Sequence, residues 1–210
     1  MSLKISAVIL AGGHGTRFGS YKPDFSVHGR TLLEYLVRAI GPLYEELFVV
    51  VGTELQREQI RSHMKQKIVI LTDRVLGVGP LGGILTGASS ANNEYCQILP
   101  VDSPLPVSRV LIHLADCAKG YEAAIPTWPD GRLEPLHGVY KANKAVEEAE
   151  HLVSLHDYSI ISLVHALTNT CFVSIEELRA LDPDLETFAN VNTREDIEKI
   201  TSKLRERLAH

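Results

Sequence analysis

Residues 5–22 read ISAVILAGGHGTRFGSYK. The first part, 5–11, is an almost unbroken apolar run, which predicts a strand covered by helices on both faces. Four glycines follow within eight residues, and glycine lets the backbone adopt positive φ and brings N–H groups close to a bound group. A buried strand that runs into such a turn predicts an α/β fold with its ligand at the carboxyl end of the sheet.

Apolar runs and amphipathic stretches alternate along the first 130 residues. The sequence predicts strands at 5–11, 47–51, 68–72, 96–101 and 122–127, and helices at 31–40, 54–65, 81–91 and 107–118. This alternation predicts a three-layer α/β/α architecture around a Rossmann-like, doubly wound, mostly parallel sheet.

The pattern changes after residue 127. The turn signal Pro129-Asp130-Gly131 leads into an apolar run at 133–140, which predicts a hairpin or an antiparallel excursion. Further helices are expected at 142–155, 159–167 and 193–208, with short strands near 171–175 and 187–191. Because no repeat or linker divides the chain, residues 1–210 are expected to form a single domain.

Composition excludes several classes of protein. The chain has 210 residues, of which 45% are hydrophobic and 22% charged, so a disordered or fibrous chain is excluded. The net charge of −5 gives no overall attraction to nucleic acid. No apolar stretch is long enough for a membrane span, and the three cysteines lie far apart, so we expect a cytoplasmic protein that binds neither nucleic acid nor membranes. The histidines show no paired metal-binding spacing, so no structural metal is expected.

The glycine-rich turn also carries two cations, Arg17 and Lys22. Both can pair with phosphate oxygens, the arginine through its bidentate fork and the lysine as a point charge. The segment lacks the Gly-Lys-Ser/Thr ending of a P-loop and is longer than the dinucleotide-binding fingerprint. Its position at a strand end favours phosphate binding over a surface turn with incidental basic residues.

The segment LAGGxGxRxGxxK at 10–22 resembles the signature of nucleotidyltransferases, and within them of the MobA-type molybdenum cofactor guanylyltransferases. The segments GPLGG at 79–83, DSP at 102–104 and NVNT at 190–193 extend the resemblance along the chain. It implies a nucleotide-diphospho-sugar transferase-like fold and transfer of GMP from GTP to the terminal phosphate of molybdopterin. It also implies partner proteins from molybdenum cofactor biosynthesis or molybdoenzyme chaperones, and it sets no oligomeric state.

The resemblance assigns roles to individual residues. Lys22, Arg17 and Asp102 are implied in catalysis, with Asp102 binding Mg²⁺. The implied nucleotide-binding residues are Leu10, Ala11, Gly12, Gly13, Gly15, Lys22, Gly52, Asp73, Gly79 and Asp102. Asp102 and Asp73 each follow a predicted strand, where a carboxylate reaches the sheet edge, although aspartate is also common there as a turn residue.

Three segments allow two interpretations. The glycines at 82 and 83 permit either close approach of a ligand or close helix–sheet packing. Asn190 and Asn192 would share one face of an extended strand, where two amides can bind a polar ligand, and the resemblance implies that they lie near the metal and the acceptor. Thr193-x-x-Asp196 also resembles a capping box for the last helix. Arg132 and His137 are candidate contacts to an acceptor phosphate.

The choice of substrates rests on the resemblance. The chain has Tyr21 and Gly52 where the family can carry aspartate and asparagine, so guanine recognition is assigned to backbone groups around Leu10, Gly12 and Gly79. Transfer to a sugar 1-phosphate or to cobinamide phosphate, and a non-catalytic nucleotide- or cofactor-binding module, stay open as alternatives.

Overall fold

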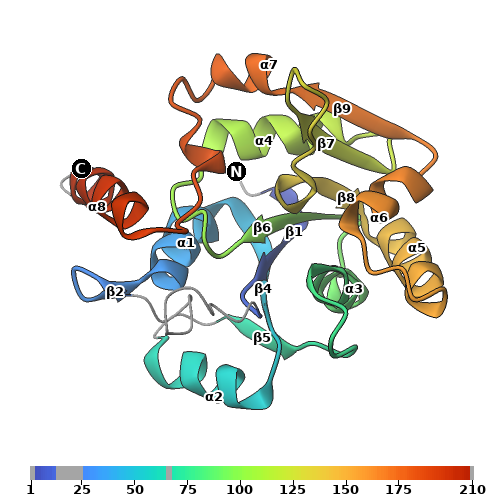
Figure 1. The fold of residues 1–210 in the computed structure, drawn as a ribbon, viewed down its shortest axis with the longest axis horizontal. Helices are drawn as coiled ribbons and strands as arrows, with labels where there is room; N and C mark the ends of the chain where they lie inside the picture. The colour runs from blue at the N-terminus through green and yellow to red at the C-terminus, as the bar shows by residue number, and fades with distance from the viewer. Residues whose placement is uncertain (1–2, 13–25, 65–67, 209–210) are drawn as a thin grey trace.

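The structure is a computed structural model that describes residues 3–12, 26–64 and 68–208 (Figure 1). Its main feature is a seven-stranded sheet in the order β5-β4-β1-β6-β8-β7-β9. The strands are β5 (Val69–Thr72), β4 (Tyr44–Val51), β1 (Leu3–Leu10), β6 (Tyr95–Pro100), β8 (Val139–Lys141), β7 (Ala123–Thr127) and β9 (Thr170–Ser174). All neighbours pair in parallel except β8, which is antiparallel to both β6 and β7. The predicted doubly wound, mostly parallel sheet is confirmed.

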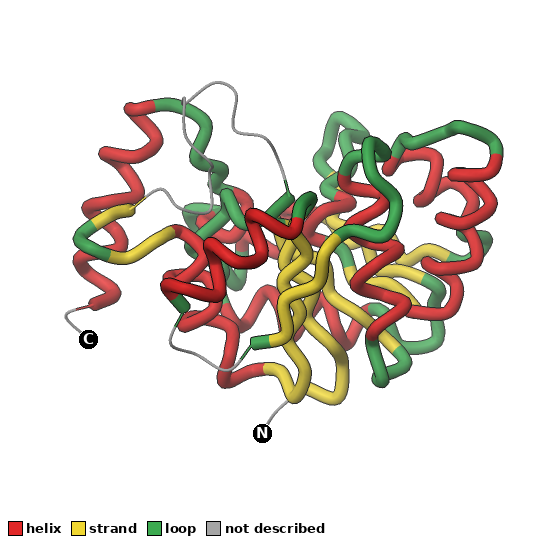
Figure 2. Tube along the Cα trace, turned by 90° about the horizontal axis from the view of Figure 1, so that it is seen from below, coloured by secondary structure: helices red, strands yellow, loops and turns green. Residues whose placement is uncertain are grey.

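Helices cover both faces of the sheet (Figure 2). Successive side chains of β1 point to opposite faces of the sheet: Ala7 and Ile9 belong to one buried cluster and Val8 to the other. The first cluster is covered by α1 (Leu32–Ile40), α2 (Glu54–His63), α4 (Ser108–Cys117) and α7 (Ile175–Arg179). The second is covered by α3 (Pro80–Ser90), α5 (Ala142–Ser154) and α6 (Ile160–Ala166). Burial on both faces explains why the strands are nearly continuous apolar runs.

Local capping explains where two of the predicted helices begin. Thr31 precedes α1 and accepts a hydrogen bond from the N–H of Glu34, whose carboxylate accepts one from Thr31 in return. Thr53 and Gln56 form the same reciprocal box at the start of α2. Each box satisfies two N–H groups that the first helical turn leaves without partners.

The antiparallel excursion after β7 consists of a tight turn, a 3₁₀-helix and strand β8. The turn closes through the N–H of Gly131, which donates to the carbonyl of Trp128 at 2.9 Å. The predicted antiparallel excursion is confirmed, since β8 is antiparallel to its two neighbours, but only part of the apolar run at 133–140 is strand: Leu133 makes an isolated antiparallel bridge and the 3₁₀-helix η3 (Pro135–His137) precedes β8. Proline has no N–H for a sheet, so it interrupts the ladder here.

The prediction of a strand at 187–191 is wrong. The chain forms the 3₁₀-helix η4 (Glu186–Phe188) instead. The carboxylate of Asp182 accepts hydrogen bonds from the N–H groups of Glu186 and Thr187 and from the hydroxyl of Thr187. These bonds to a nearby side chain replace a sheet ladder.

Small elements complete the fold. The sequence did not predict α7, the 3₁₀-helix η2 (Gly41–Leu43) or the short hairpin β2 (Ser26–Val27) and β3 (Arg30–Thr31). The last helix, α8 (Arg194–Leu208), lies outside the sheet and packs through Ile200 and Leu204 on a third buried cluster with Leu32 and Tyr35 of α1 (Figure 1). No helix within the described ranges is long and apolar enough to cross a membrane.

Candidate active site

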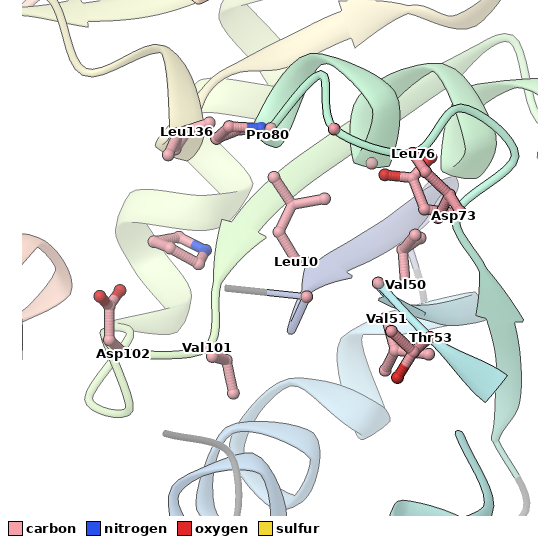
Figure 3. A pocket seen from close by; sticks show the side chains of 16 residues that line it. Leu10, Val50, Val51, Thr53, Asp73, Leu76, Pro80, Val101, Asp102 and Leu136 are labelled. Carbon is pink, nitrogen blue, oxygen red and sulfur yellow. The ribbon is translucent and has the colours of Figure 1, made fainter. Parts of the chain in front are cut away.

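A pocket of about 700 Å³ opens at the carboxyl ends of β5, β4, β1 and β6 (Figure 3). This volume falls within the range of roughly 300–1,000 Å³ that is usual for small-molecule sites. The described residues that line it are Leu10, Gly12, Val50, Val51, Gly52, Thr53, Asp73, Leu76, Gly77, Gly79, Pro80, Gly83, Pro100, Val101, Asp102 and Leu136. The predicted residues Leu10, Gly12, Gly52, Asp73, Gly79 and Asp102 are therefore brought together in one cavity.

The strand order fixes the order of the residues along this edge. Each of the four strands is followed within two residues by one predicted site residue: Asp73 after β5, Gly52 after β4, Gly12 after β1 and Asp102 after β6. Backbone hydrogen bonds hold these ends together: Ala11 N–H to Val50 C=O at 2.8 Å, Asp73 N–H to Val51 C=O at 2.7 Å, and Val101 N–H to Leu10 C=O at 3.2 Å. The positions of these residues follow from sheet geometry rather than from loop conformation.

Asp73 and Asp102 stand at the two ends of this row. They are three strand spacings apart, which corresponds to about 14 Å. Two oxygen ligands of one Mg²⁺ lie at most about 4 Å from each other, because each is roughly 2.0–2.1 Å from the ion. The two carboxylates are too far apart to share an ion, and Figure 3 shows them on opposite sides of the pocket.

Gly12 is required by the close approach of two strand ends. A Cβ atom at this position would lie 2.9 Å from the backbone nitrogen of Gly52. That nitrogen cannot move away easily, because its N–H donates to Oε1 of Gln56 at 2.9 Å. The absence of a side chain at Gly12 therefore lets the end of β1 pack directly against the end of β4.

Asp102 meets the requirements of a magnesium ligand. It is partly buried, it follows β6, and it lines the pocket. A carboxylate is the hard oxygen donor that Mg²⁺ prefers, and one such ligand is sufficient where phosphate oxygens and water complete the coordination. The donor chemistry at this end of the pocket thus fits a single Mg²⁺.

Asp73 is held by the first residues after β5 and by α3. Its Oδ1 accepts hydrogen bonds from the N–H of Val75 and from the hydroxyl of Thr86, both at 3.1 Å. Burial raises the pKa of the Asp73 carboxyl, and the hydrogen bonds from Val75 and Thr86 oppose that shift. The bond to Val75 is the turn interaction that aspartate commonly makes, so Asp73 both shapes the loop and faces the pocket.

The glycines of α3 have different roles. A Cβ atom on Gly82 would lie 2.7 Å from Oδ2 of Asp73, so this glycine lets the helix pack against that carboxylate. Gly82 does not line the pocket, whereas Gly79 and Gly83 do. The interpretation that Gly82 is open to a ligand is wrong, and helix–carboxylate packing explains it.

The segment 190–192 reaches the pocket rim through a long-range contact. The N–H of Val191 donates to the carbonyl of Asp102 at 2.8 Å. The hydroxyl of Ser103 donates to Oδ1 of Asn190. Asn190 is exposed and lies beside Asp102, although it does not itself line the pocket. Because Oδ1 accepts from Ser103, the amide NH₂ of Asn190 is the group suited to a phosphate oxygen.

His137 is buried and contacts Ser103. Its side chain is 2% exposed, and its Nε2 lies 3.2 Å from Oγ of Ser103. Since that oxygen donates to Asn190, Nε2–H is the donor, while Nδ1 lies 3.8 Å from Oε2 of Glu134. Burial lowers the pKa of His137 to about 4, so the ring is neutral at pH 7. A buried neutral ring is unsuited to the predicted direct contact with an acceptor phosphate, and His137 instead orients Ser103 and Asn190.

Arg132 and Asn192 lie outside the pocket lining. The guanidinium of Arg132 is over the ring of Trp128, 4.6 Å from its centroid, and 61% of the side chain is exposed. Asn192 directly precedes a capping box in which Asp196 N–H donates to Thr193 Oγ1 and the Asp196 carboxylate accepts from the N–H groups of Thr193 and Asn192. The capping interpretation is confirmed, and the acceptor roles of Arg132 and Asn192 stay predictions.

Several predicted residues fall elsewhere. Gly13, Gly15, Arg17 and Lys22 lie outside the described residues. Ala11 is fully buried, does not line the pocket, and its N–H already pairs with β4.

The sequence missed several pocket residues, of which Leu76 and Thr53 are the clearest examples. Leu76 lines the pocket although 71% of its surface is exposed, which makes it an apolar contact suited to a flat ring. Thr53 caps α2 and lines the pocket as well. For Leu76, the sequence feature that could have indicated a pocket residue is the Leu76-Gly77 dipeptide before the predicted helix. For Thr53, it is the capping box at the start of α2.

Known proteins share both the sequence pattern and the fold. The sequence matches the family described as MobA-like NTP transferase domain over residues 7–170. A probable molybdenum cofactor guanylyltransferase of Methanosarcina acetivorans is 34% identical over 93% of this chain and 89% of its own length. A molybdenum cofactor guanylyltransferase of Syntrophotalea carbinolica is 32% identical over 92% of this chain and 89% of its own length. The crystal structure of molybdopterin-guanine dinucleotide biosynthesis protein A from Archaeoglobus fulgidus covers 96% of this chain and all of its own, with a TM-score of 0.82 and 25% identity.

The matched region contains the carboxyl ends of all four strands that form the pocket. It also contains Gly12, Asp73 and Asp102, which the structure brings to one edge of the sheet. By sequence and by the geometry of this edge, the chain belongs to the MobA-like NTP transferase domain family.

Proposed function

We propose that this protein transfers GMP from GTP to the terminal phosphate of a molybdopterin-type acceptor and releases pyrophosphate. The observation that carries the proposal is the position of Gly12 and Asp102, which follow the adjacent strands β1 and β6 and line one pocket. The names of the relatives that align over nine-tenths of the chain support the choice of reaction.

The nucleotide is assigned to the row of strand ends. The glycine-rich turn that begins at Gly12, with the cations Arg17 and Lys22 that the sequence supplies, would hold the triphosphate. Exposed Leu76 and the backbone around Gly79 form the apolar part of the pocket near Asp73, which suits a base and its sugar. The acceptor is assigned to the other end, where Asn190 lies beside Asp102.

Asp102 would hold a Mg²⁺ ion together with the phosphates. Bound Mg²⁺ supplies neutralisation of the charge that accumulates when two anions approach each other. The chain's contribution at this end is the carboxylate of Asp102, which its position two residues after β6 holds at the pocket edge. Asp73, three strands away, is assigned to the nucleotide rather than to the metal.

The reaction is an in-line displacement at phosphorus. An oxygen of the acceptor phosphate attacks the α-phosphorus of GTP, a new P–O–P bridge forms, and the bond from the α-phosphorus to the β-phosphate oxygen breaks. Pyrophosphate carries away the electron pair of that bond. Because the attacking oxygen is already anionic, no side chain has to remove a proton, and the protein contributes alignment and charge neutralisation.

The test is release of pyrophosphate with each of the four nucleoside triphosphates. Each is combined with molybdopterin, with a sugar 1-phosphate, with cobinamide phosphate, or with no acceptor. We expect release only with GTP and molybdopterin. Release with another acceptor would replace the proposed substrate, and binding of GTP without release under any condition would favour a non-catalytic binding module.

Lys22→Ala examines the contribution of the glycine-rich turn in the same assay. We expect it to lower turnover by about 100-fold or more, because it removes a fixed positive charge from the developing negative charge. Lys4→Ala, a basic residue at the opposite end of β1, is the matched control and should keep wild-type turnover. Full activity of Lys22→Ala would contradict the assignment of this turn to the triphosphate.

The cellular context is proposed on the same basis. The continuous seven-stranded sheet supports treating residues 1–210 as one catalytic domain. GTP as substrate and three free thiols favour the cytoplasm. Other proteins of molybdenum cofactor biosynthesis and molybdoenzyme chaperones are the proposed partners.

A further inference from the structure

A second cluster of chemically reactive side chains lies away from the pocket, at the carboxyl end of α4. It consists of His113 and Cys117 on α4 and Glu177 on α7, and one ligand atom of each lies within 4.8 Å of the other two. None of the three lines the pocket. Cys117 is the last residue of α4, nine residues after the helix begins near the Asp102 loop, or about 14 Å along the helix axis.

The fold places these residues by simple rules. His113 and Cys117 are four residues apart on a helix, so their side chains share one face. Ile175 and Leu178 of α7 are fully buried in the same cluster as Leu114 of α4, which holds Glu177 against that face. A search for His–His or Cys–Cys spacings misses this pair because its two ligand types differ.

The two distances from His113 are close to those of a small tetrahedral site. Nε2 of His113 and Sγ of Cys117 are 3.5 Å apart. Zinc ligands at roughly 2.0 Å for nitrogen and 2.3 Å for sulfur lie about 3.5 Å apart around a tetrahedral centre. Oε1 of Glu177 is 2.7 Å from the same Nε2, so it needs to move outward by only about half an ångström to reach the corresponding nitrogen–oxygen spacing.

A single ring nitrogen faces both partners. Nε2 of His113 is within contact of the Glu177 carboxylate and of the Cys117 sulfur, although it carries at most one proton. That proton can form a good hydrogen bond with the Glu177 carboxylate or with the Cys117 sulfur, but not with both. A cation placed among the three atoms would instead be bound by all of them.

Further groups that attract a cation surround the cluster. Asp116 precedes Cys117 on α4, and Glu177 of α7 and Cys171 of β9 lie close enough to Cys117 to interact with it electrostatically. A divalent cation bound there would be attracted by these groups and would stabilise the thiolate of Cys117.

We propose that His113, Cys117 and Glu177 form a binding site for a divalent cation of the zinc class, with water in the fourth position. A nitrogen, a sulfur and one carboxylate are the ligand set that zinc accepts, whereas Mg²⁺ requires an oxygen environment. The site would clamp α4 to α7. The chain after α7 leads to Thr187, whose hydroxyl accepts a hydrogen bond from Val107 directly before α4, so both ends of α4 would be fixed to the same segment.

The experiment is metal binding by the reduced, full-length protein, with no transfer assay. The metal-free protein is titrated with Zn²⁺ against a competing chelator, and Co²⁺ is used as a spectroscopic probe. We expect one equivalent of Zn²⁺ and a near-ultraviolet thiolate-to-cobalt absorption band. We expect Zn²⁺ to raise the Tm of the wild-type protein, since a ligand that binds only the folded state stabilises it.

Variants separate the ligands from their surroundings. Cys117→Ser should abolish the cobalt band, and His113→Gln and Glu177→Gln should each weaken Zn²⁺ binding by about 10-fold or more. The side chain of Glu177 is half-exposed, so the Glu177→Gln variant is expected to fold like the wild type. His165→Gln, an exposed histidine on α6, and Asp102→Ala should bind Zn²⁺ like the wild type, and Cys171→Ser should have a smaller effect than Cys117→Ser.

Two results would overturn the proposal. One is the absence of a stoichiometric Zn²⁺ equivalent in the wild-type protein. The other is binding that is unchanged by both Cys117→Ser and Glu177→Gln, or that is lost in Asp102→Ala, because the metal would then occupy a different site.

Discussion

Two sides of the pocket are built in different ways. The proposed nucleotide side includes Leu10, Gly12, Gly52 and Asp73, each at or just beyond the end of a parallel strand. The acceptor side was predicted from Asn190, Asn192, Arg132 and His137, which come from irregular segments and from η3. The four residues named on the nucleotide side line the pocket, whereas the predicted nucleotide-binding residue Ala11 and all four predicted acceptor residues do not.

The difference shows what a strand end contributes. A parallel sheet fixes strand spacing and direction, so a residue one position past a strand has a predictable place. Asn190 depends instead on the Val191–Asp102 and Ser103–Asn190 hydrogen bonds, which join residues almost ninety positions apart. The acceptor side is therefore held by tertiary contacts, and its residues act in part through one another, as His137 does through Ser103.

The largest effect is expected from Asp102, where the two sides meet. Asp102→Ala should lower turnover by about 100-fold or more, because it removes the proposed metal ligand, while the Tm stays near the wild-type value. Steady-state kinetics and thermal unfolding check both parts. Asp184→Ala, which changes an exposed carboxylate that does not line the pocket, is the matched control. Full turnover in Asp102→Ala would remove the reason to place the reaction between the two sides.

The second prediction concerns His137 and pH. Burial lowers the pKa of His137 to about 4, so between about pH 6.5 and 4 the unfolded chain binds a proton there and the folded protein does not. The free energy of unfolding should fall as the pH is lowered through this range, by at most about 3 kcal/mol from this residue. His137→Gln removes this contribution, so its stability should depend less steeply on pH.

Urea unfolding at several pH values measures the difference between the two proteins. His165→Gln changes an exposed histidine and should keep the wild-type slope. If His137→Gln and the wild type lose stability in parallel from pH 6.5 to 4, His137 is not the neutral buried group that supports the acceptor side.

A smaller effect is expected from Leu76 on the nucleotide side. Leu76→Ser should raise the KM for GTP a few-fold with little change in kcat, because it removes apolar surface of roughly one small side chain from the pocket. Leu155→Ser alters another highly exposed leucine, at the end of α5, and should leave the KM unchanged. An equal KM for Leu76→Ser and the wild type would place the base elsewhere in the pocket.

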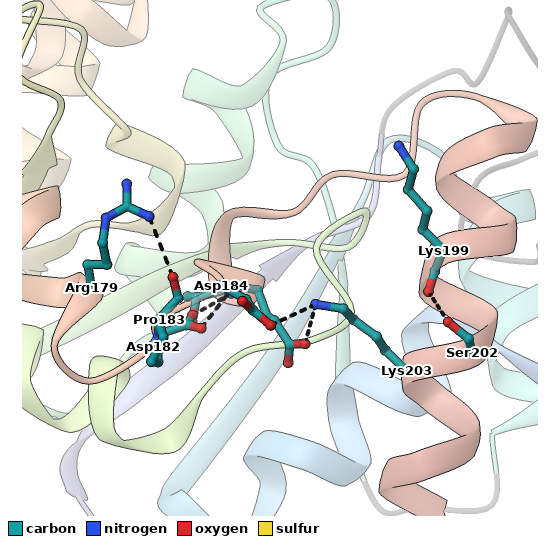
Figure 4. A network of polar contacts seen from close by, with 9 residues as sticks. Arg179, Asp182, Pro183, Asp184, Lys199, Ser202 and Lys203 are labelled. Carbon is teal, nitrogen blue, oxygen red and sulfur yellow. Dashed lines mark hydrogen bonds and ion pairs between the residues drawn. The ribbon is translucent and has the colours of Figure 1, made fainter.

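The smallest effect is expected from the ion pairs that tie α8 to the segment after α7. Lys203 contacts Glu186 at 2.6 Å and Asp184 at 3.4 Å (Figure 4). Lys203 is 37% exposed, so Lys203→Ala should cost less than about 1 kcal/mol, and the difference should shrink further at high salt. A loss of several kcal/mol would mean that charge, rather than the buried contacts of Ile200 and Leu204, holds α8.

The predictions from sequence failed where side chains competed with backbone pairing. The run at 187–191 contains Phe188 and Val191 and was predicted as a strand, but Asp182 binds the backbone of residues 186 and 187 and forms η4. At 133–140 the predicted antiparallel excursion is present, and Pro135, which cannot donate to a sheet, confines its paired strand to β8.

Apolar periodicity and short-range capping signals were enough to predict the doubly wound sheet, the main strands and helices of the first 130 residues, and the residues at the strand ends. Three features became visible only in the folded chain: residues 190–191 contact the Asp102 loop, His137 is buried, and His113, Cys117 and Glu177 lie close together. Such contacts join segments distant in the chain, and no local pattern encodes the distance between them.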